Sequence, residues 1–449
     1  PGSAMPSFAN LLNETERWQV VYYIKTFSEY FSDPDLNPYN KTVSIGDSPQ
    51  STPDRIKMGR DAYEKGECFK CHGNEGRGNG ESANELTDQE GYRILPRNLT
   101  NGWQYRGGTD VKDIYTRFTT GMDGTPMPSF IDNLTDEERW NLSIYVKSLI
   151  HERDLTGSMV KVVFVDGDLP LDPNDPVWDK AETLEISLAG QIIWKPRWLI
   201  PSVDQMYAKA IFNENDIAFK LVYDDRNKNV EHDVETLIPP TDTPYPVLAS
   251  EDPDFKPHYL NNKFNLRDSV AIQFPVKPSD GPEKPHFFWG GSSNQVQLLK
   301  WNADYQEDPD KKRCVEELNG TGSKNLPKLQ AEESQTAQGK GVYNDGQWSV
   351  VIKKPLLSDD KNDVQFVRGR LIPISFQAWD GSNSEDATRM SLSTWNYLML
   401  EGKTPIGVYI YTGVFVAIAG ILEWFFTWRA RKSKKPKSFL NFNFTDEAS

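Results

Sequence analysis

Two cysteines and a histidine lie close enough together to share one chemical task. Cys68 and Cys71 are three positions apart, and His72 follows directly. On one helical turn, two thiols at this spacing can each form a thioether with a vinyl group of a haem, and the next imidazole can reach the iron. A redox cysteine pair or half of a zinc site is the alternative, but the remaining histidines offer no second pair at zinc-site spacing: His151, His232, His258 and His286. The C-x-x-C-H motif therefore predicts covalently bound haem c.

A methionine further along the chain is the candidate for the sixth ligand of that iron. Met127 lies in the run Gly-Thr-Pro-Met-Pro-Ser-Phe at 124–130, 55 residues after His72. Prolines on both sides favour an extended backbone and remove competing donors, whereas the nearby Met122 lacks this setting. An iron held by His72 and Met127 has no open position for a substrate, which indicates electron transfer rather than catalysis.

The segment around this motif, 53–155, is expected to be helical. Helices are predicted at 54–65, 111–119 and 135–150, the last with Thr135 as N-cap and a Glu at the third helical position. From its first helix to its last, the segment resembles a class I cytochrome c. The resemblance implies that the stretch 96–106 lies at the propionate side of the haem, where four side chains are candidates for holding the carboxylates: Arg97, Trp103, Tyr105 and Arg106.

The N-terminus repeats part of this segment. A shift of 122 residues places Gly-Ser-Ala-Met-Pro-Ser-Phe at 2–8 on the run at 124–130, and it aligns Glu-Arg-Trp at 16–18 with the same tripeptide at 138–140. Residues 1–30 are therefore predicted to be the last third of another cytochrome c domain, with Met5 as the axial ligand of a second haem c. The same spacing puts the attachment motif about 50 positions before Pro1, so we expect the chain to begin inside that domain. Residues 31–52, rich in Pro, Asp, Ser and Asn, form the predicted linker.

After residue 155 the pattern changes from helical periodicity to short alternating runs separated by Pro, Asp, Asn and Gly. Such runs occur at 158–164, 184–186, 191–194, 216–223, 269–274, 295–301, 348–353 and 371–379. Strands of this length with turn residues between them predict an antiparallel β-sandwich over 156–402.

Several stretches of the predicted sandwich carry a family resemblance. They are Asp-Pro-Val-Trp at 175–178, Asp-Ser-Val-Ala-Ile-Gln-Phe-Pro at 268–275, Trp-Gly-Gly at 289–291 with Lys-Trp-Asn-Ala-Asp at 300–304, and Ala-Trp-Asp-Gly-Ser-Asn at 378–383 with Ser-Thr-Trp at 393–395. In these stretches the chain resembles the haem-binding γ subunits of ethylbenzene dehydrogenase and its relatives in the type II dimethyl sulfoxide reductase family.

This resemblance implies a b-type haem between Met and Lys ligands, with an iron–sulfur β subunit and a molybdenum α subunit as partners. Trp289 stands where the methionine of the family is expected, and Met390 stands at the lysine position. Two interpretations stay open. Either Met390 ligates haem b together with a partner such as His286 or Lys300, or the sandwich has kept its fold and lost the haem.

Residues 406–428 are almost entirely apolar or aromatic, in a chain that is otherwise strongly polar. At 1.5 Å per residue, a helix of this length crosses the hydrocarbon core of a membrane, so we predict a transmembrane helix at 405–428. A buried core helix is the alternative. The tail, 429–449, begins with Arg429, Arg431, Lys432, Lys434, Lys435 and Lys437. The positive-inside rule then places the tail in the cytoplasm and the body in the periplasm or another extracytoplasmic space.

The expected fold class is multidomain α + β, with all-α cytochrome c domains, then an antiparallel β-sandwich, then one C-terminal transmembrane helix. A net charge of −15 leaves no basic surface for phosphates, so no nucleic-acid partner is expected. The sequence favours a membrane-anchored electron-transfer subunit of a periplasmic molybdenum oxidoreductase, with nitrite oxidoreductase or nitrate reductase as first candidates and a soluble cytochrome or other redox carrier as a further partner. No catalytic residue is predicted.

Two other functional classes stay open. One is an extracytoplasmic cytochrome whose sandwich binds carbohydrate, and the other is a haem enzyme with an open iron position.

Overall fold

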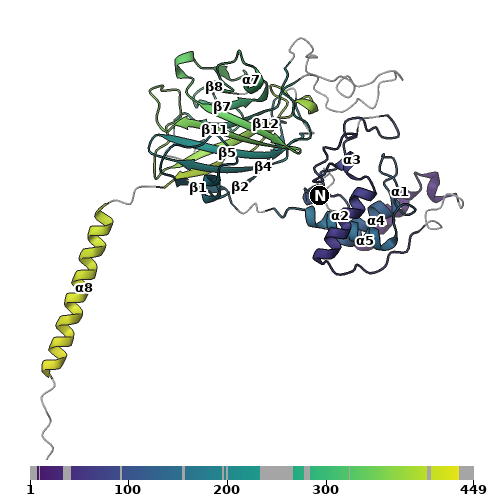
Figure 1. The fold of residues 1–449 in the computed structure, drawn as a ribbon, viewed down its shortest axis with the longest axis horizontal. Helices are drawn as coiled ribbons and strands as arrows, with labels where there is room; N and C mark the ends of the chain where they lie inside the picture. Colours follow the sequence, from purple (N-terminus) through teal and green to yellow (C-terminus); the bar gives the residue numbers. More distant parts are fainter. Residues whose placement is uncertain are drawn as a thin grey trace, which may run out of the picture. The chain divides into compact units, whose positions relative to one another are not determined.

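The computed structural model describes residues 8–9, 11–33, 42–91, 94–153, 157–194, 197–198, 201–232, 266–277, 284–322, 324–401 and 406–433. The chain divides into two compact units after Leu400. The first unit contains a helical domain and a sheet domain, and the second contains helix α8 (Figure 1). Met5, the predicted ligand of a second haem, falls outside the described residues.

Two helices of the helical domain begin at side-chain N-caps, of which Thr135 is the one predicted from the sequence. The elements of this domain are α2 (Pro53–Lys65), α3 (Phe69–His72), the 3₁₀ turn η3 (Gly102–Gln104), α4 (Val111–Thr120) and α5 (Asp136–Leu149). The Thr52 side chain accepts a hydrogen bond from the Arg55 N–H at the start of α2. Thr135 and Glu138 form a capping box at the start of α5. The helices predicted from the sequence are confirmed to within about two residues at their ends.

Helices α2 and α5 cross where α2 carries a glycine. A Cβ added at Gly59 would overlap the carbonyl oxygen of Asn141 and lie 2.6 Å from the Cβ of Tyr145. The absence of a side chain therefore lets the two backbones approach. The crossing holds an apolar core, against which Cys68 and Met127 also pack: Ala62, Tyr63, Ile114, Phe118, Leu134, Leu142, Tyr145 and Val146.

Helix α1 (Glu14–Lys25) begins in the same way as α5. Asn13 and Glu16 form a capping box 122 positions before the one at the start of α5. The two helices differ in burial, because Trp18 of α1 is 55% exposed and its counterpart Trp140 is 6% exposed. None of the residues of α1 is buried. Its apolar side chains thus have no core in the part of the chain that the structure describes.

The sheet domain comprises the described residues of 157–400, where 14 strands form one sheet. The strands are β1 (Met159–Phe164), β2 (Leu184–Ser187), β3 (Ala189–Gly190), β4 (Gln205–Phe212), β5 (Asp216–Asp224), β6 (Ser269–Pro275), β7 (Val296–Asn302), β8 (Val315–Gly320), β9 (Lys328–Leu329), β10 (Gln338–Asn344), β11 (Gln347–Pro355), β12 (Leu371–Trp379), β13 (Ser391–Leu392) and β14 (Asn396–Leu400). Their order is β10-β11-β5-β4-β1-β14-β12-β6-β7-β8-β9, with β2 on β4 and with β13 between β12 and β3.

Short helical elements lie outside the sheet and the helical domain. They are η1 (Glu29–Phe31), η4 (Pro176–Lys180), α7 (Ala303–Glu307), η6 (Glu332–Ser334) and η7 (Gly381–Asn383).

Strand β1 departs from the predicted antiparallel pattern. Val160 pairs in parallel with Leu398 of β14, and Val163 pairs in parallel with Ile211 of β4. The remaining strand pairs in the described residues are antiparallel. The expectation of a purely antiparallel sheet is wrong at this strand, because the connections that follow β1 are long enough for a crossover.

Strands that are not neighbours in the sheet pack face to face. The rings of Phe219 on β5 and Phe274 on β6 have centroids 5.6 Å apart, and those of Trp301 on β7 and Trp348 on β11 are 4.9 Å apart. All four side chains are at most 1% exposed. Residues from both halves of the strand order therefore enclose one apolar core.

A buried cation also lies inside this domain. The Lys354 ammonium contacts carboxylate oxygens of Glu317 at 2.5 Å and Asp363 at 2.9 Å, and all three side chains are fully buried. The positive charge of Lys354 thus offsets one of the two negative charges away from water, where an unpaired charge is costly.

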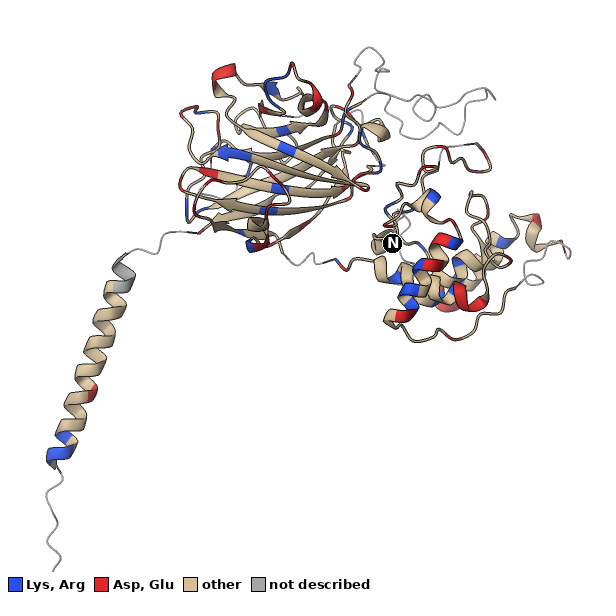
Figure 2. Cartoon of the chain, viewed as in Figure 1, with Lys and Arg blue, Asp and Glu red and all other residues tan. Residues whose placement is uncertain are grey.

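Helix α8 (Ile406–Ser433) forms the second unit. Its stretch 410–432 is, by length and composition, the one membrane-span candidate in the part of the chain that the structure describes, and none of it is buried. Figure 2 shows basic residues gathered at one end of α8. There the Lys432 ammonium lies 4.0 Å from the centroid of the Trp428 ring. The predicted C-terminal apolar helix is confirmed.

We expect Gly59→Ala to lower the free energy of unfolding of the helical domain by about 2 kcal/mol, because the new methyl group must push α2 away from α5. This loss exceeds the gain of about 1 kcal/mol from the helix propensity of Ala. Gly46→Ala is the control, since nothing lies within 4 Å of a Cβ at that position. Denaturant unfolding followed by circular dichroism measures both. Equal stability of the two variants would contradict the close crossing.

Candidate haem c site

The attachment motif lies on a single helical turn that opens α3. The backbone N–H of His72 donates to the carbonyl oxygen of Cys68 at 2.9 Å, and that of Cys71 donates to the same oxygen at 3.3 Å. Both cysteines are free rather than joined in a disulfide. The turn thus keeps two thiols and an imidazole together, as attachment of a haem requires.

A backbone carbonyl orients the imidazole of His72. Its Nδ1 lies 2.9 Å from the carbonyl oxygen of Arg97, which can only accept a hydrogen bond. Nδ1 therefore carries the proton, and Nε2 is left with a lone pair for iron. Burial lowers the pKa of His72, although the hydrogen bond to Arg97 opposes this. The neutral form, which is the one that ligates metals, is favoured.

Met127 is held in a loop against the same apolar core. The carbonyl oxygen of Met127 accepts a hydrogen bond from the Met122 N–H at 3.1 Å, and the Phe130 N–H donates to the Phe118 carbonyl oxygen at 2.7 Å. Met127 is half-buried and packs against the core together with Cys68, whereas Met122 is 44% exposed. The surroundings of Met127 fit an axial ligand better than those of Met122. The roles of His72, Cys68, Cys71 and Met127 as haem ligands stay predictions.

The four side chains predicted at the propionate side have different partners. Tyr105 donates to the Leu99 carbonyl oxygen at 2.9 Å, and Trp103 donates to Asp204 of the sheet domain at 3.0 Å. Arg97 donates to Gln104 at 3.2 Å. Burial, and then repulsion from Arg106 and Arg226, lowers the pKa of Arg97. Guanidinium groups thus gather here, as binding of the haem carboxylates would require. The assignment of Arg97, Trp103, Tyr105 and Arg106 to the propionates stays a prediction.

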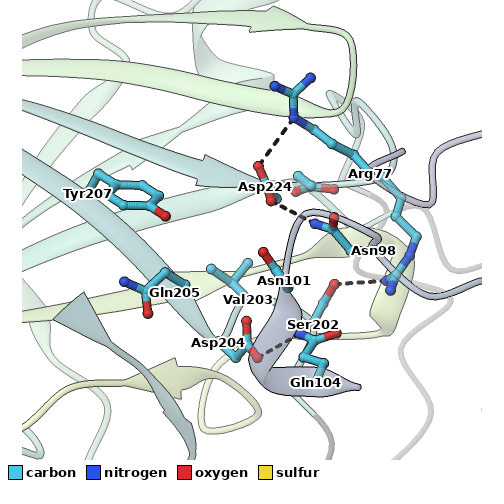
Figure 3. Close-up of a pocket in the computed structure, with 12 residues that line it drawn as sticks. Arg77, Asn98, Asn101, Gln104, Ser202, Val203, Asp204, Gln205, Tyr207 and Asp224 are labelled. Atoms are coloured by element: carbon cyan, nitrogen blue, oxygen red, sulfur yellow. Dashed lines mark hydrogen bonds and ion pairs between the residues drawn. The ribbon is translucent and has the colours of Figure 1, made fainter. Parts of the chain in front are cut away.

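The sheet domain contacts the stretches of the helical domain that follow His72 and Arg97, a feature that the sequence did not reveal (Figure 3). The Asn98 amide donates to Asp224 at the end of β5 at 2.7 Å, and Arg77 Nε lies 3.6 Å from the other oxygen of Asp224. Gln104 donates to Asp204 at 2.7 Å. Asn98 directly follows Arg97, so Asp224 helps to hold the segment whose carbonyl orients His72. These residues are polar types common on any surface, and no local pattern distinguishes them.

The residues considered for haem b all belong to the sheet domain. Met390 is fully buried in one apolar cluster with Trp289 and Trp379. The Lys300 ammonium lies 4.3 Å from the centroid of the Trp379 ring, and burial lowers its pKa to about 8. Nδ1 of His286 accepts a hydrogen bond from the Phe288 N–H at 3.1 Å. Met390 thus shares a cluster with the tryptophan whose ring Lys300 faces, and the role of both residues as haem b ligands stays a prediction.

A family comparison agrees with this geometry. Residues 56–149 match the family described as cytochrome c, and this range includes the attachment motif and the methionine loop. The helical domain is therefore a cytochrome c domain, and membership in this family indicates covalently bound haem c.

Three relatives extend the comparison. The chain is 29% identical over 154 residues to a respiratory nitrate reductase heme subunit of Haloferax mediterranei, a match that covers 34% of this chain and 50% of that protein. It is 24% identical to the chlorate reductase subunit gamma of Ideonella dechloratans, over 51% of this chain and 78% of the relative. It is 25% identical to the dimethylsulfide dehydrogenase subunit gamma of Rhodovulum sulfidophilum, over 50% of this chain and 74% of the relative. The chain thus spans about half the length of the first of these relatives. It carries a cytochrome c domain and is similar to the γ subunits of two oxidoreductases.

We expect Met127→Ala to lower the reduction potential of haem c and to let the reduced protein bind carbon monoxide, because an axial thioether raises the potential and occupies the sixth position. Redox titration and the visible spectrum under carbon monoxide measure these changes. Met122→Ala is the matched control and is expected to behave as the unchanged protein. Carbon monoxide binding to the unchanged protein would contradict the assignment of Met127.

Proposed function

We propose that this chain is an electron-transfer subunit of a membrane-bound molybdenum oxidoreductase, with nitrate or nitrite as the first substrates to test. The observation that carries the proposal is an attachment motif and a methionine loop packed on one core, in a chain similar to γ subunits. When bound, haem c supplies a one-electron iron couple. His72 and Met127 would hold the iron from this chain, and an iron with both ligands would have no position for a substrate.

The partners in this proposal are an iron–sulfur β subunit and a molybdenum α subunit, with a soluble cytochrome or another redox carrier beyond the complex. Similarity to γ subunits supports them, because a γ subunit is by name one part of an assembly. The contacts of Arg77, Asn98 and Trp103 with the sheet domain support electron exchange through that domain. We propose that the sheet domain folds as a β-sandwich, and the face-to-face pairs Phe219–Phe274 and Trp301–Trp348 support this.

We further propose that residues 1–30 belong to a second cytochrome c domain with Met5 as a ligand of its haem. The capping boxes of α1 and α5 support this, because they recur at the same offset of 122 as the sequence repeat. The exposed Trp18 supports it as well, since the matching Trp140 is a core residue.

Helix α8 is proposed to cross the membrane, with the body in the periplasm or another extracytoplasmic space. Its length and apolar composition support a membrane span. The basic residues at its C-terminal end, Arg429, Arg431 and Lys432, support a cytoplasmic tail.

An affinity tag on this chain, followed by purification from native membranes, tests the complex. We expect molybdenum, non-haem iron and haem c to copurify, and we expect nitrite to reduce or nitrate to oxidise the haem. Metal analysis and the pyridine haemochrome spectrum measure the cofactors, and the spectrum also counts haem b. A preparation in which haem c copurifies with neither molybdenum nor non-haem iron would refute the proposed function.

A further inference from the structure

Three buried aspartates meet at one end of the sheet domain. Asp225 follows β5, Asp268 precedes β6 and Asp380 follows β12. They are 2%, 0% and 1% exposed, and one oxygen from each carboxylate lies within 4.8 Å of the other two. Strands β6 and β12 are hydrogen-bonded neighbours, whereas β5 lies in the other half of the strand order. The cluster therefore joins the two halves of the domain.

The charge of this cluster is not compensated by side chains. In the described part of the chain, no Lys or Arg makes an ion pair with Asp225, Asp268 or Asp380. The same domain places Lys354 between its other pair of buried carboxylates. Three carboxylates without a counter-charge would be strongly destabilising in an interior, so the cluster requires either protons or a bound cation.

Hydrogen bonds satisfy only part of the cluster. Asp268 accepts from the Asn229 N–H at 2.7 Å, from the Trp348 indole at 3.0 Å and from the Gly381 N–H at 3.0 Å. Asp225 Oδ1 and Asp380 Oδ1 accept backbone N–H groups of their own loops. Their second oxygens, Oδ2 in both residues, are buried and have no hydrogen-bond partner. Two oxygens with free lone pairs thus remain inside the cluster.

Two further side chains independently point to a ligand at this place. The Tyr223 hydroxyl is fully buried on β5, two residues before Asp225, and it has no hydrogen-bond partner. Tyr223 is paired across β5 and β11 with Trp348, whose indole N–H donates to Asp268. The Asn229 Oδ1 atom is likewise buried without a partner, on the residue whose N–H contacts Asp268. Both atoms can serve as ligands of a cation or of its water.

We propose that Asp225, Asp268 and Asp380 bind one Ca²⁺ ion, with Asn229 as an additional oxygen donor. The available donors are all oxygen, without the nitrogen or sulfur that transition metals prefer. Ca²⁺ accepts six to eight oxygen ligands in irregular geometry, and water completes such a shell. The ion connects the end of β5 with the adjacent ends of β6 and β12. Asp224, next to Asp225, contacts Asn98 and Arg77, so the ion also stabilises the part of the sheet domain that contacts the cytochrome c domain.

The test uses the purified full-length protein in its complex. After exchange into calcium-free buffer, elemental analysis is expected to find about one Ca²⁺ per chain. A chelator is expected to lower the midpoint of thermal unfolding of the sheet domain. Addition of Ca²⁺ should restore the midpoint, and an equal concentration of Mg²⁺ should not, because Mg²⁺ requires a smaller octahedral shell.

Asp225→Asn and Asp380→Asn are expected to retain less than about a tenth of the bound Ca²⁺ and to unfold at a midpoint that no longer responds to the chelator. Asp359→Asn removes an exposed carboxylate of the same domain and should behave as the unchanged protein. Two results would overturn the proposal. One is a full-length protein that contains no bound Ca²⁺ and whose unfolding midpoint does not change when the chelator is added. The other is equal Ca²⁺ content in the unchanged protein and the two Asn variants. The first measurement needs no variant, so it decides the question even where a variant fails to fold.

Discussion

The hydrogen bond between Nδ1 of His72 and the carbonyl oxygen of Arg97 connects the parts of the chain on which haem ligation depends. It fixes the protonated nitrogen of the imidazole and joins the attachment turn to a segment that lies 25 residues away. That segment continues into Asn98, which donates to Asp224 of the sheet domain. The orientation of the His72 imidazole therefore depends on contacts in both domains. A displacement of the sheet domain would be transmitted to His72 through Asn98 and Arg97.

The helix crossing supplies the rigidity that this hydrogen bond needs. Gly59 lets α2 lie directly on α5, and the core beneath it receives both Cys68 and Met127. Cys68, which is predicted to attach the haem, and Met127, which is predicted to ligate its iron, thus pack on one apolar cluster.

Features with local causes could be predicted from the sequence. The attachment turn, the proline-flanked Met127 and the capping box at Thr135 each depend on residues within a few positions of one another. The parallel pairing of β1 could not be predicted, because alternation in a strand is the same whether its neighbours run parallel or antiparallel. The contacts of Asp204 and Asp224 with the cytochrome c domain join residues more than 95 positions apart, and nothing in the local sequence of either partner marks them. The buried aspartates were missed for the same reason, since Asp225, Asp268 and Asp380 come from three distant strand ends.

The uncovered helix α1 has a consequence for how the chain behaves outside an assembly. Tyr22, Tyr23 and Ile24 of α1 and Phe27, two residues after its end, are each more than half exposed. Large exposed apolar side chains this close together favour association in water. The isolated chain can then self-associate through α1 as well as through the apolar helix α8. A detergent that covers α8 alone would not prevent self-association through α1.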